Sequence, residues 1–323
     1  MKPRYNLFTP KSVAAVFISA ICMTSCDKER LTPNPLSFFN PDVTFNDAEA
    51  LKATLIACER NMRIEWYGDA PPIITESIFS DIAVEGTTDK SGPAQNMNLQ
   101  ITPDAQLNSG DYNKIGWYWL EGYKGIKYAN VAITRIDQPK YKNEQERNEI
   151  LGAAYFHRAM RYYRLTHQFG DIPLILDEVV APKLDFQSTK REVILQKMKE
   201  DLEFAEKWVP VSPDKGSASR GAVSHLLTKI NLALGLFDDA IESSSHAIDG
   251  GTHKLMTTRF GIDAGNASRN VVWDLHRPEN KALNVNTEGL MLVVDRLLVD
   301  GNNDGGIQSM RNGVPFWHNN INS

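Results

Sequence analysis

Apolar residues that recur at spacings of three and four dominate this 323-residue chain. In the segment 46–63, one face carries Ala48, Leu51, Leu55, Cys58 and Met62, which is the period of an amphipathic α-helix. A buried structural thiol is therefore expected at Cys58. Later segments repeat the pattern, and the predicted helices are 46–63, 112–136, 145–169, 190–208, 220–234 and 238–248.

Residues that begin or end helices support these bounds. Gly170 stands where a helix commonly ends. Thr189 and Glu192 have the spacing of a capping box, and so predict the start of the helix 190–208. Residues 171–175 are expected to be extended because the position before a proline avoids the helical region. The run 271–275 predicts a strand.

The order of these elements predicts a fold class. The helices pair as 112–136 with 145–169 and 190–208 with 220–234, and 238–248 begins a third hairpin. We therefore expect a mostly α protein of tetratricopeptide-like helical hairpins, with long irregular loops and a few short strands. The segment 64–112, rich in Pro, Gly, Asn and Asp, is the longest such loop, and loops of this kind often carry function.

The first residues predict export. A basic start, with Lys2 and Arg4, leads into a short apolar run that ends at Cys26. Residues before that cysteine resemble the bacterial lipobox, which implies acylation of Cys26 and attachment to a lipid bilayer. An ordinary signal peptide with a chance cysteine is the alternative. The expected organisation is a lipoprotein signal peptide at 1–25, a lipidated tether at 26–41 and one folded domain at 42–323.

The charge balance excludes one class of partner. The chain has a net charge of −5, and the first 25 residues hold three basic residues and no acidic ones, so the rest carries −8. Because phosphate contacts need clustered Lys and Arg, no nucleic-acid partner is expected. No phosphate loop or dinucleotide fingerprint occurs, so no cofactor is expected.

Motifs for catalysis and metal binding are weak. No histidine pair has zinc spacing, and no nucleophile elbow occurs, so no catalytic residue is predicted. Paired carboxylates for glycoside hydrolysis stay open because such partners meet only in space. Asp300, Asn302 and Asp304 match the first half of a calcium loop, but its twelfth position is Arg311 instead of a bidentate Glu, so an Asp-Gly-rich turn is favoured.

One family resemblance covers about residues 45–305. The segment 149–175 ends in Phe-Gly-Asp-x-Pro and resembles the SusD/RagB family of Bacteroidetes nutrient-uptake lipoproteins. Blocks at 119–130, 219–235 and 293–301 match the family pattern in the same order. The residues that carry the resemblance in 149–175 are Ala154, Tyr155, Phe156, Arg158, Tyr163, Phe169, Gly170, Asp171 and Pro173.

The resemblance implies a function without catalysis. It implies a lipid-anchored protein of the cell outer membrane that faces the exterior and binds a glycan or related nutrient. It also implies delivery of that ligand to a SusC-like TonB-dependent transporter. A membrane-anchored glycoside hydrolase and a helical-repeat protein-interaction scaffold are the alternatives. Family members extend beyond the last matching block, so part of the C-terminal region is expected to be missing, by truncation or as a short natural variant.

Candidate ligand-binding residues lie in or near the long loop and near the end of the chain. Aromatic side chains can pack on the C–H faces of sugar rings, while polar groups bind the hydroxyls. Trp119, in contrast, is predicted to be a core residue because it lies on an apolar stripe, and Arg158 and Asp171 are expected to form a structural ion pair or cap. The candidates are the aromatic Trp66, Tyr67, Tyr112, Trp117 and Trp317 and the polar Asp81 and Asn113.

Overall fold

The computed structural model describes residues 45–63, 65, 76, 80 and 114–294. The expected signal peptide and tether at 1–41 lie outside these residues. Two short strands and eight helices are described: α4 (Ala48–Arg63), α7 (Lys114–Thr134), α8 (Glu144–Phe169), β1 (Ile172–Pro173), β2 (Ser188–Thr189), α9 (Arg191–Trp208), α10 (Arg220–Leu234), α11 (Phe237–Ile248), α12 (Val271–His276) and α13 (Pro278–Lys281).

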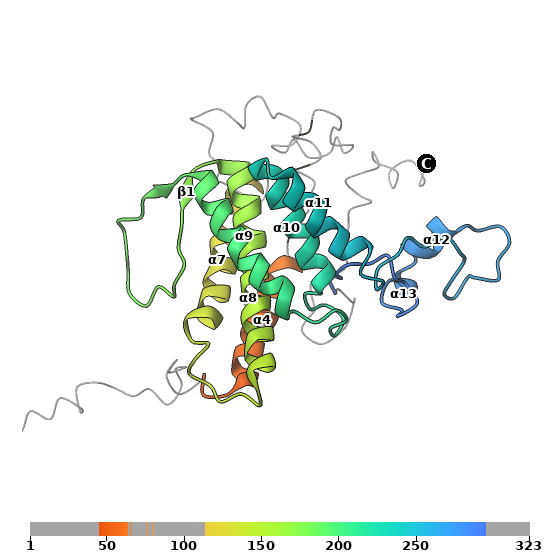
Figure 1. Cartoon of the computed structure of the whole chain (residues 1–323), viewed down its shortest axis with the longest axis horizontal. Coiled ribbons are helices and arrows are strands. Elements are labelled where there is room, and N and C mark those ends of the chain that lie inside the picture. The colour runs from red at the N-terminus through yellow and green to blue at the C-terminus, as the bar shows by residue number, and fades with distance from the viewer. Residues whose placement is uncertain (1–44, 64, 66–75, 77–79, 81–113, 295–323) are drawn as a thin grey trace, which may run out of the picture. The chain divides into compact units, whose positions relative to one another are not determined.

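The long helices form an array of antiparallel hairpins. Helix α8 packs between α7 and α9, α10 packs on α9, and α11 packs on α10, as Figure 1 shows. Helix α4 lies against both α7 and α8. This arrangement confirms the predicted mostly helical fold. None of the described helices combines the length and the apolar character that crossing a bilayer requires.

The main core lies where α8, α9 and α10 meet. Its fully buried members include Tyr162, Ile194, Met198, Leu202 and Ile230. A smaller cluster joins α4 to the end of α7 and the start of α8. Close packing of this kind is the main stabilising contribution of a helical array.

The start of α9 differs from the prediction. Lys190 occupies the N-cap and makes no side-chain cap, so the expected capping box of Thr189 and Glu192 is wrong. Thr189 instead pairs with Ile172 in the small antiparallel sheet. The Asp171 carboxylate accepts a hydrogen bond from the Arg191 backbone N–H at 3.0 Å, and therefore caps α9 from outside the helix.

The strand predicted at 271–275 is also wrong, because this run forms α12. The Asn270 side chain accepts a hydrogen bond from the Trp273 backbone N–H and so begins a helical turn. Asp274 is fully buried and bonds the Arg259 guanidinium through both carboxylate oxygens. These fixed contacts override the strand preference of two valines.

A single buried arginine forms hydrogen bonds that connect the helices of the array. Arg158 on α8 donates to Asp201 on α9 at 2.6 and 2.9 Å, to Asn130 on α7 at 3.1 Å and to the Leu176 carbonyl at 2.8 Å. Asn130 in turn donates to the Ile175 carbonyl at 2.9 Å. Three helices and the extended segment after β1 therefore meet at one guanidinium, which confirms the expected structural role of Arg158.

His157 is the neighbouring residue on α8 and is buried, with 2% of its surface exposed. Neither ring nitrogen has a hydrogen-bond partner among the described residues. Burial, together with the nearby Arg161 charge, lowers the pKa of His157 to about 3. The imidazole is therefore neutral in the folded protein at neutral pH.

Stability should depend on His157 at mildly acidic pH. Its folded-state pKa lies below its unfolded value of about 6.5, so the unfolded chain binds the extra proton and unfolding becomes easier as pH falls below about 6.5. Between pH 7.5 and 5, the contribution to the free energy of unfolding should fall by about 2 kcal/mol. Urea denaturation at several pH values measures this loss.

The matched variants are His157→Leu and His276→Leu, because His276 is exposed on α12. His157→Leu should remove this part of the pH dependence, whereas His276→Leu should keep it. An unchanged dependence in His157→Leu would contradict the assignment.

Candidate functional site

Most of the predicted site residues lie outside the part of the chain that the structure describes. Trp117 is the exception, and it lies in the first turns of α7. The candidates outside the described residues are Cys26, Trp66, Tyr67, Asp81, Tyr112, Asn113 and Trp317, together with the weak calcium candidates Asp300, Asn302 and Asp304.

The start of α7 presents two tryptophans in different settings. The Trp117 ring packs edge-on against buried Tyr118, with 5.2 Å between ring centroids, and remains partly accessible. Trp119 is 40% exposed, so its assignment to the core is wrong. Helix α8 ends at Phe169, and the Trp119 ring rests only on Phe169 and Tyr123 among the described aromatic residues. Trp119 is thus an accessible aromatic ring that sequence reasoning missed.

Buried ion pairs hold the beginning of the long loop on the α7–α8 hairpin. Glu65 is 1% exposed and lies between Arg161, at 3.3 Å, and Arg164, at 2.6 Å. The Asn61 amide donates to Glu121 on α7 at 2.7 Å. Removing one partner from a buried ion pair costs about 3–5 kcal/mol. The ion pairs of Glu65 therefore hold the chain just after α4 firmly on the α7–α8 hairpin.

Cys58 lies beside this cluster and is unsuited to chemistry. It is a free thiol with 2% of its surface exposed, which confirms the predicted burial. Burial raises the pKa of the Cys58 thiol to about 12. Among the described residues, no group of three or more His, Cys, Asp or Glu side chains could hold a metal ion.

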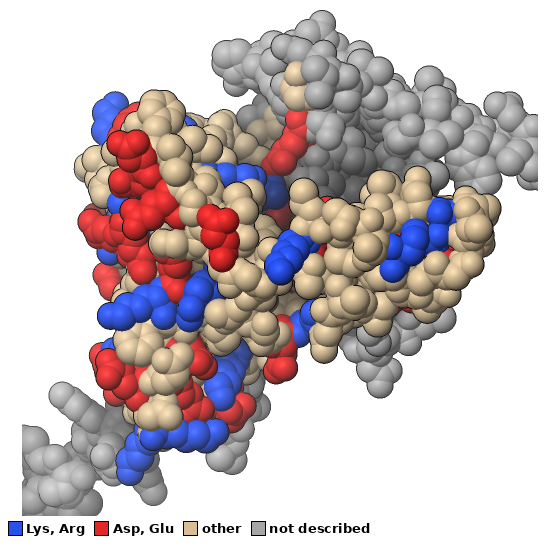
Figure 2. All heavy atoms as spheres, turned by 45° about the vertical axis from the view of Figure 1, so that its right-hand side comes forward, with Lys and Arg blue, Asp and Glu red and all other residues tan. Residues whose placement is uncertain are grey.

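The surface of the helical array carries both positively and negatively charged side chains. Figure 2 shows Lys and Arg side chains interleaved with Asp and Glu over the helical array. On α9, for example, Lys197 pairs with Glu200 at 3.1 Å. Exposed ion pairs of this kind contribute little to stability. Ligands bind preferentially in concave sites, so candidate sites are expected in the hollows of the surface.

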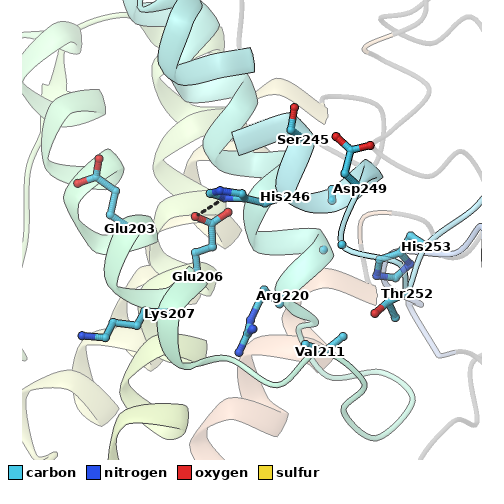
Figure 3. A pocket seen from close by; sticks show the side chains of 13 residues that line it. Glu203, Glu206, Lys207, Val211, Arg220, Ser245, His246, Asp249, Thr252 and His253 are labelled. Carbon is cyan, nitrogen blue, oxygen red and sulfur yellow. Dashed lines mark ion pairs between the residues drawn. The ribbon is translucent and has the colours of Figure 1, made fainter. Parts of the chain in front are cut away.

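One hollow of about 590 Å³ lies among α9, α10 and the end of α11 (Figure 3). Glu206 projects from α9 and pairs with His246 on α11 at 3.1 Å. The Ser224 hydroxyl also donates to Glu206, which fixes the carboxylate. Lys207 and Arg220 add donors at the lower edge of the same view. This polar lining could bind hydroxyl groups, but it contains no Trp, Tyr or Phe ring for a sugar to pack on.

The wall of this hollow depends on Gly221. A Cβ at that position would lie 2.4 Å from Nε2 of His253 and 3.2 Å from Leu290. A larger residue at this position would therefore displace the His253 imidazole from its place against α10. A second hollow of about 550 Å³ adjoins the first, and both share Val211, Thr252 and His253.

Hairpins that stack into an array, with hollows between them, define a helical-repeat binding protein. A sequence model described as "Starch-binding associating with outer membrane", of the SusD-like family, matches residues 60–232. The chain belongs to the SusD-like family. Members of this family are binding proteins without catalysis, and the description of the model names starch binding and association with the outer membrane.

Individual relatives agree with this assignment. The SusD-like protein P2 of Formosa agariphila is 26% identical over 223 residues, which are 68% of this chain and 43% of that protein. A SusD-like protein of Bacteroides fragilis has the same fold, with a TM-score of 0.63 and 19% identity over 81% of this chain and 47% of its own. A laminarin-binding SusD-like protein has a TM-score of 0.55 and 22% identity over 66% and 47%. The chain therefore spans less than half the length of these relatives.

Proposed function

We propose that this chain binds a glycan as part of an outer-membrane lipoprotein, anchored through acylated Cys26, and passes the ligand to a SusC-like TonB-dependent transporter. It does so without catalysis. The observation that carries the proposal is the family match from the end of α4 to α10, which includes the hairpins around Arg158. The laminarin-binding relative supports a glycan as the ligand.

The accessible aromatic rings of α7 support the same proposal. Trp117 and Trp119 lie in the first turns of α7, directly after the segment predicted to be the long loop. Glu65, Arg161 and Arg164 fix the other end of that loop on the same hairpin. A rigid scaffold that holds aromatic rings beside a loop is a common arrangement for ligand binding.

A second candidate function is a protein-interaction scaffold, and one surface favours it. Helix α11 is the last long helix of the described array. Its exposed face carries Phe237, Ile241 and Ile248, with 67%, 65% and 70% of their surfaces accessible. The spacing of four and then seven places them in one stripe. An exposed apolar stripe of this kind is suited to contact with another protein.

Glycan binding should depend on a tryptophan at one end of the array. Trp117→Ala should lower the affinity for laminarin oligosaccharides by about 1–3 kcal/mol, by analogy with bases stacked on aromatic rings. Isothermal titration calorimetry, with melting temperature measured in parallel, separates lost affinity from lost stability.

Trp208→Ala is the matched control. Trp208 ends α9 at the opposite end of the bundle, where its carbonyl accepts a hydrogen bond from Gln145 near the start of α8. Full affinity in Trp117→Ala and in matching alanine variants of Trp66, Tyr112 and Trp317 would contradict the aromatic site. Co-purification with the transporter but no glycan binding would favour the scaffold.

Anchoring should depend on Cys26. Cys26→Ala removes the acylated sulfur, and stable membrane attachment needs more than one lipid chain. The variant should lose acyl labelling and leave the outer-membrane fraction. Cys58→Ala, which removes the buried thiol, should fractionate like wild type. Outer-membrane fractionation of Cys26→Ala at the wild-type level would overturn the proposed anchor.

A further inference from the structure

A groove of about 750 Å³ lies between α8 and α10, apart from the hollow in Figure 3. Its floor is apolar, because Phe156 and Leu226 are 3% and 6% exposed. Each of its two walls is one face of a helix, and the residues on each wall have the sequence spacing of a helix face. The walls carry Phe156, Met160, Tyr163 and His167 on α8 and Ala222, His225, Leu226 and Lys229 on α10.

The walls lack acidic residues. Helix α10 contains no Asp or Glu, and α8 contains none after Glu149. Among the described residues that line the groove, the only carboxylate is that of Glu76, which pairs with Arg164. Lys229 is exposed and makes no ion pair or hydrogen bond within the described residues. Lys229 is thus one positive charge without a partner among the described residues of the groove, whereas Arg164 is paired with both Glu65 and Glu76.

The groove also affects the titration of its histidines. The pKa of His225 is lowered by burial and by the Lys229 charge. The pKa of His167 is lowered by burial, and the Arg191 and Lys229 charges add to that effect. The lowered pKa values keep both imidazoles neutral at neutral pH, so Lys229 is the unpaired cation of the groove among the described residues.

An aromatic surface lies in the same groove as Lys229. The rings of Tyr163 and His167 are 4.1 Å apart between centroids, tilted by 41°. Tyr163 remains partly accessible, and no hydrogen bond occupies its hydroxyl within the described part of the chain. A ring face next to cationic donors suits a ligand with apolar C–H groups on one side and an acidic group on its edge.

We propose that the α8–α10 groove binds an acidic sugar, one that carries a carboxylate or a sulfate, with Lys229 and His225 on the acidic group and Tyr163 against the ring. This inference rests on the proposed function and specifies its ligand class. Charge complementarity between the acid-free walls and the anion carries it.

The full chain is titrated with three oligosaccharides of equal length: an oligogalacturonate, which carries carboxylates alone, a chondroitin sulfate fragment, which carries sulfates and carboxylates, and a laminarin fragment as the neutral probe. At least one acidic probe should bind about tenfold more tightly than the neutral one, which corresponds to about 1.4 kcal/mol. Raising the salt concentration from about 0.05 to about 0.5 M should weaken acidic binding alone.

Lys229→Gln should weaken binding of the acidic probe about tenfold and leave neutral binding unchanged. The matched control, Lys127→Gln, removes an exposed lysine from α7 and should leave both unchanged. Equal binding of the acidic probe by Lys229→Gln and wild type would overturn the inference. Binding of the neutral probe alone would also overturn it while sustaining the proposed function, and binding of none of the three would count against both.

Discussion

The array depends on one buried guanidinium on α8 that bonds partners on two other helices and on the segment after β1. Arg158 bonds Asp201, Asn130 and the Leu176 carbonyl, and thereby fixes α7, α9 and the segment after β1 relative to α8. A charge buried to this extent is costly unless each donor has an acceptor. Its pairing therefore selects one packing of the helices among the many that their apolar stripes would allow.

The features proposed for function are set by this packing. The α8–α10 groove exists because α9 packs against both helices and holds their outer faces at a distance. The segment predicted to be a long loop, which carries most of the candidate aromatic residues, follows Glu65. Arg161 and Arg164 hold Glu65, and they lie three and six residues after Arg158 on the same helix. Helix α8 is thus at once the centre of the core and one wall of the proposed site.

The sequence predicted the helices well because their apolar period and their glycine ends are local signals. Gly170 and Gly235 end α8 and α10 with φ of 73° and 74°, as expected. The predictions were wrong where contacts with other residues, and not the local pattern, determine the structure. Asp171 caps α9 in place of Thr189. Arg259 and Asn270 convert an apparent strand into α12. Trp119 extends past the end of α8 and so remains exposed.

The groove was harder to foresee. His167 and Lys229 lie 62 positions apart in the sequence, and each belongs to a helix with the apolar period of an ordinary core helix. The absence of acidic residues from 150–169 and 220–234 is visible in the sequence, and it is the one signal that could have suggested a cationic surface. Only the packing of α9 shows that the two helices face the same space.

The most direct test of the account is a double-mutant cycle on Arg158 and Asp201. Urea denaturation would give the free energy of unfolding for Arg158→Met, Asp201→Leu and the double variant. Each single change should cost about 3–5 kcal/mol because it breaks the buried ion pair and leaves Arg158 without a carboxylate, or Asp201 with Lys197 alone as its cation. The double variant should recover at least about 2 kcal/mol of the summed cost. Costs that add to within about 0.5 kcal/mol would contradict the central role of this pair.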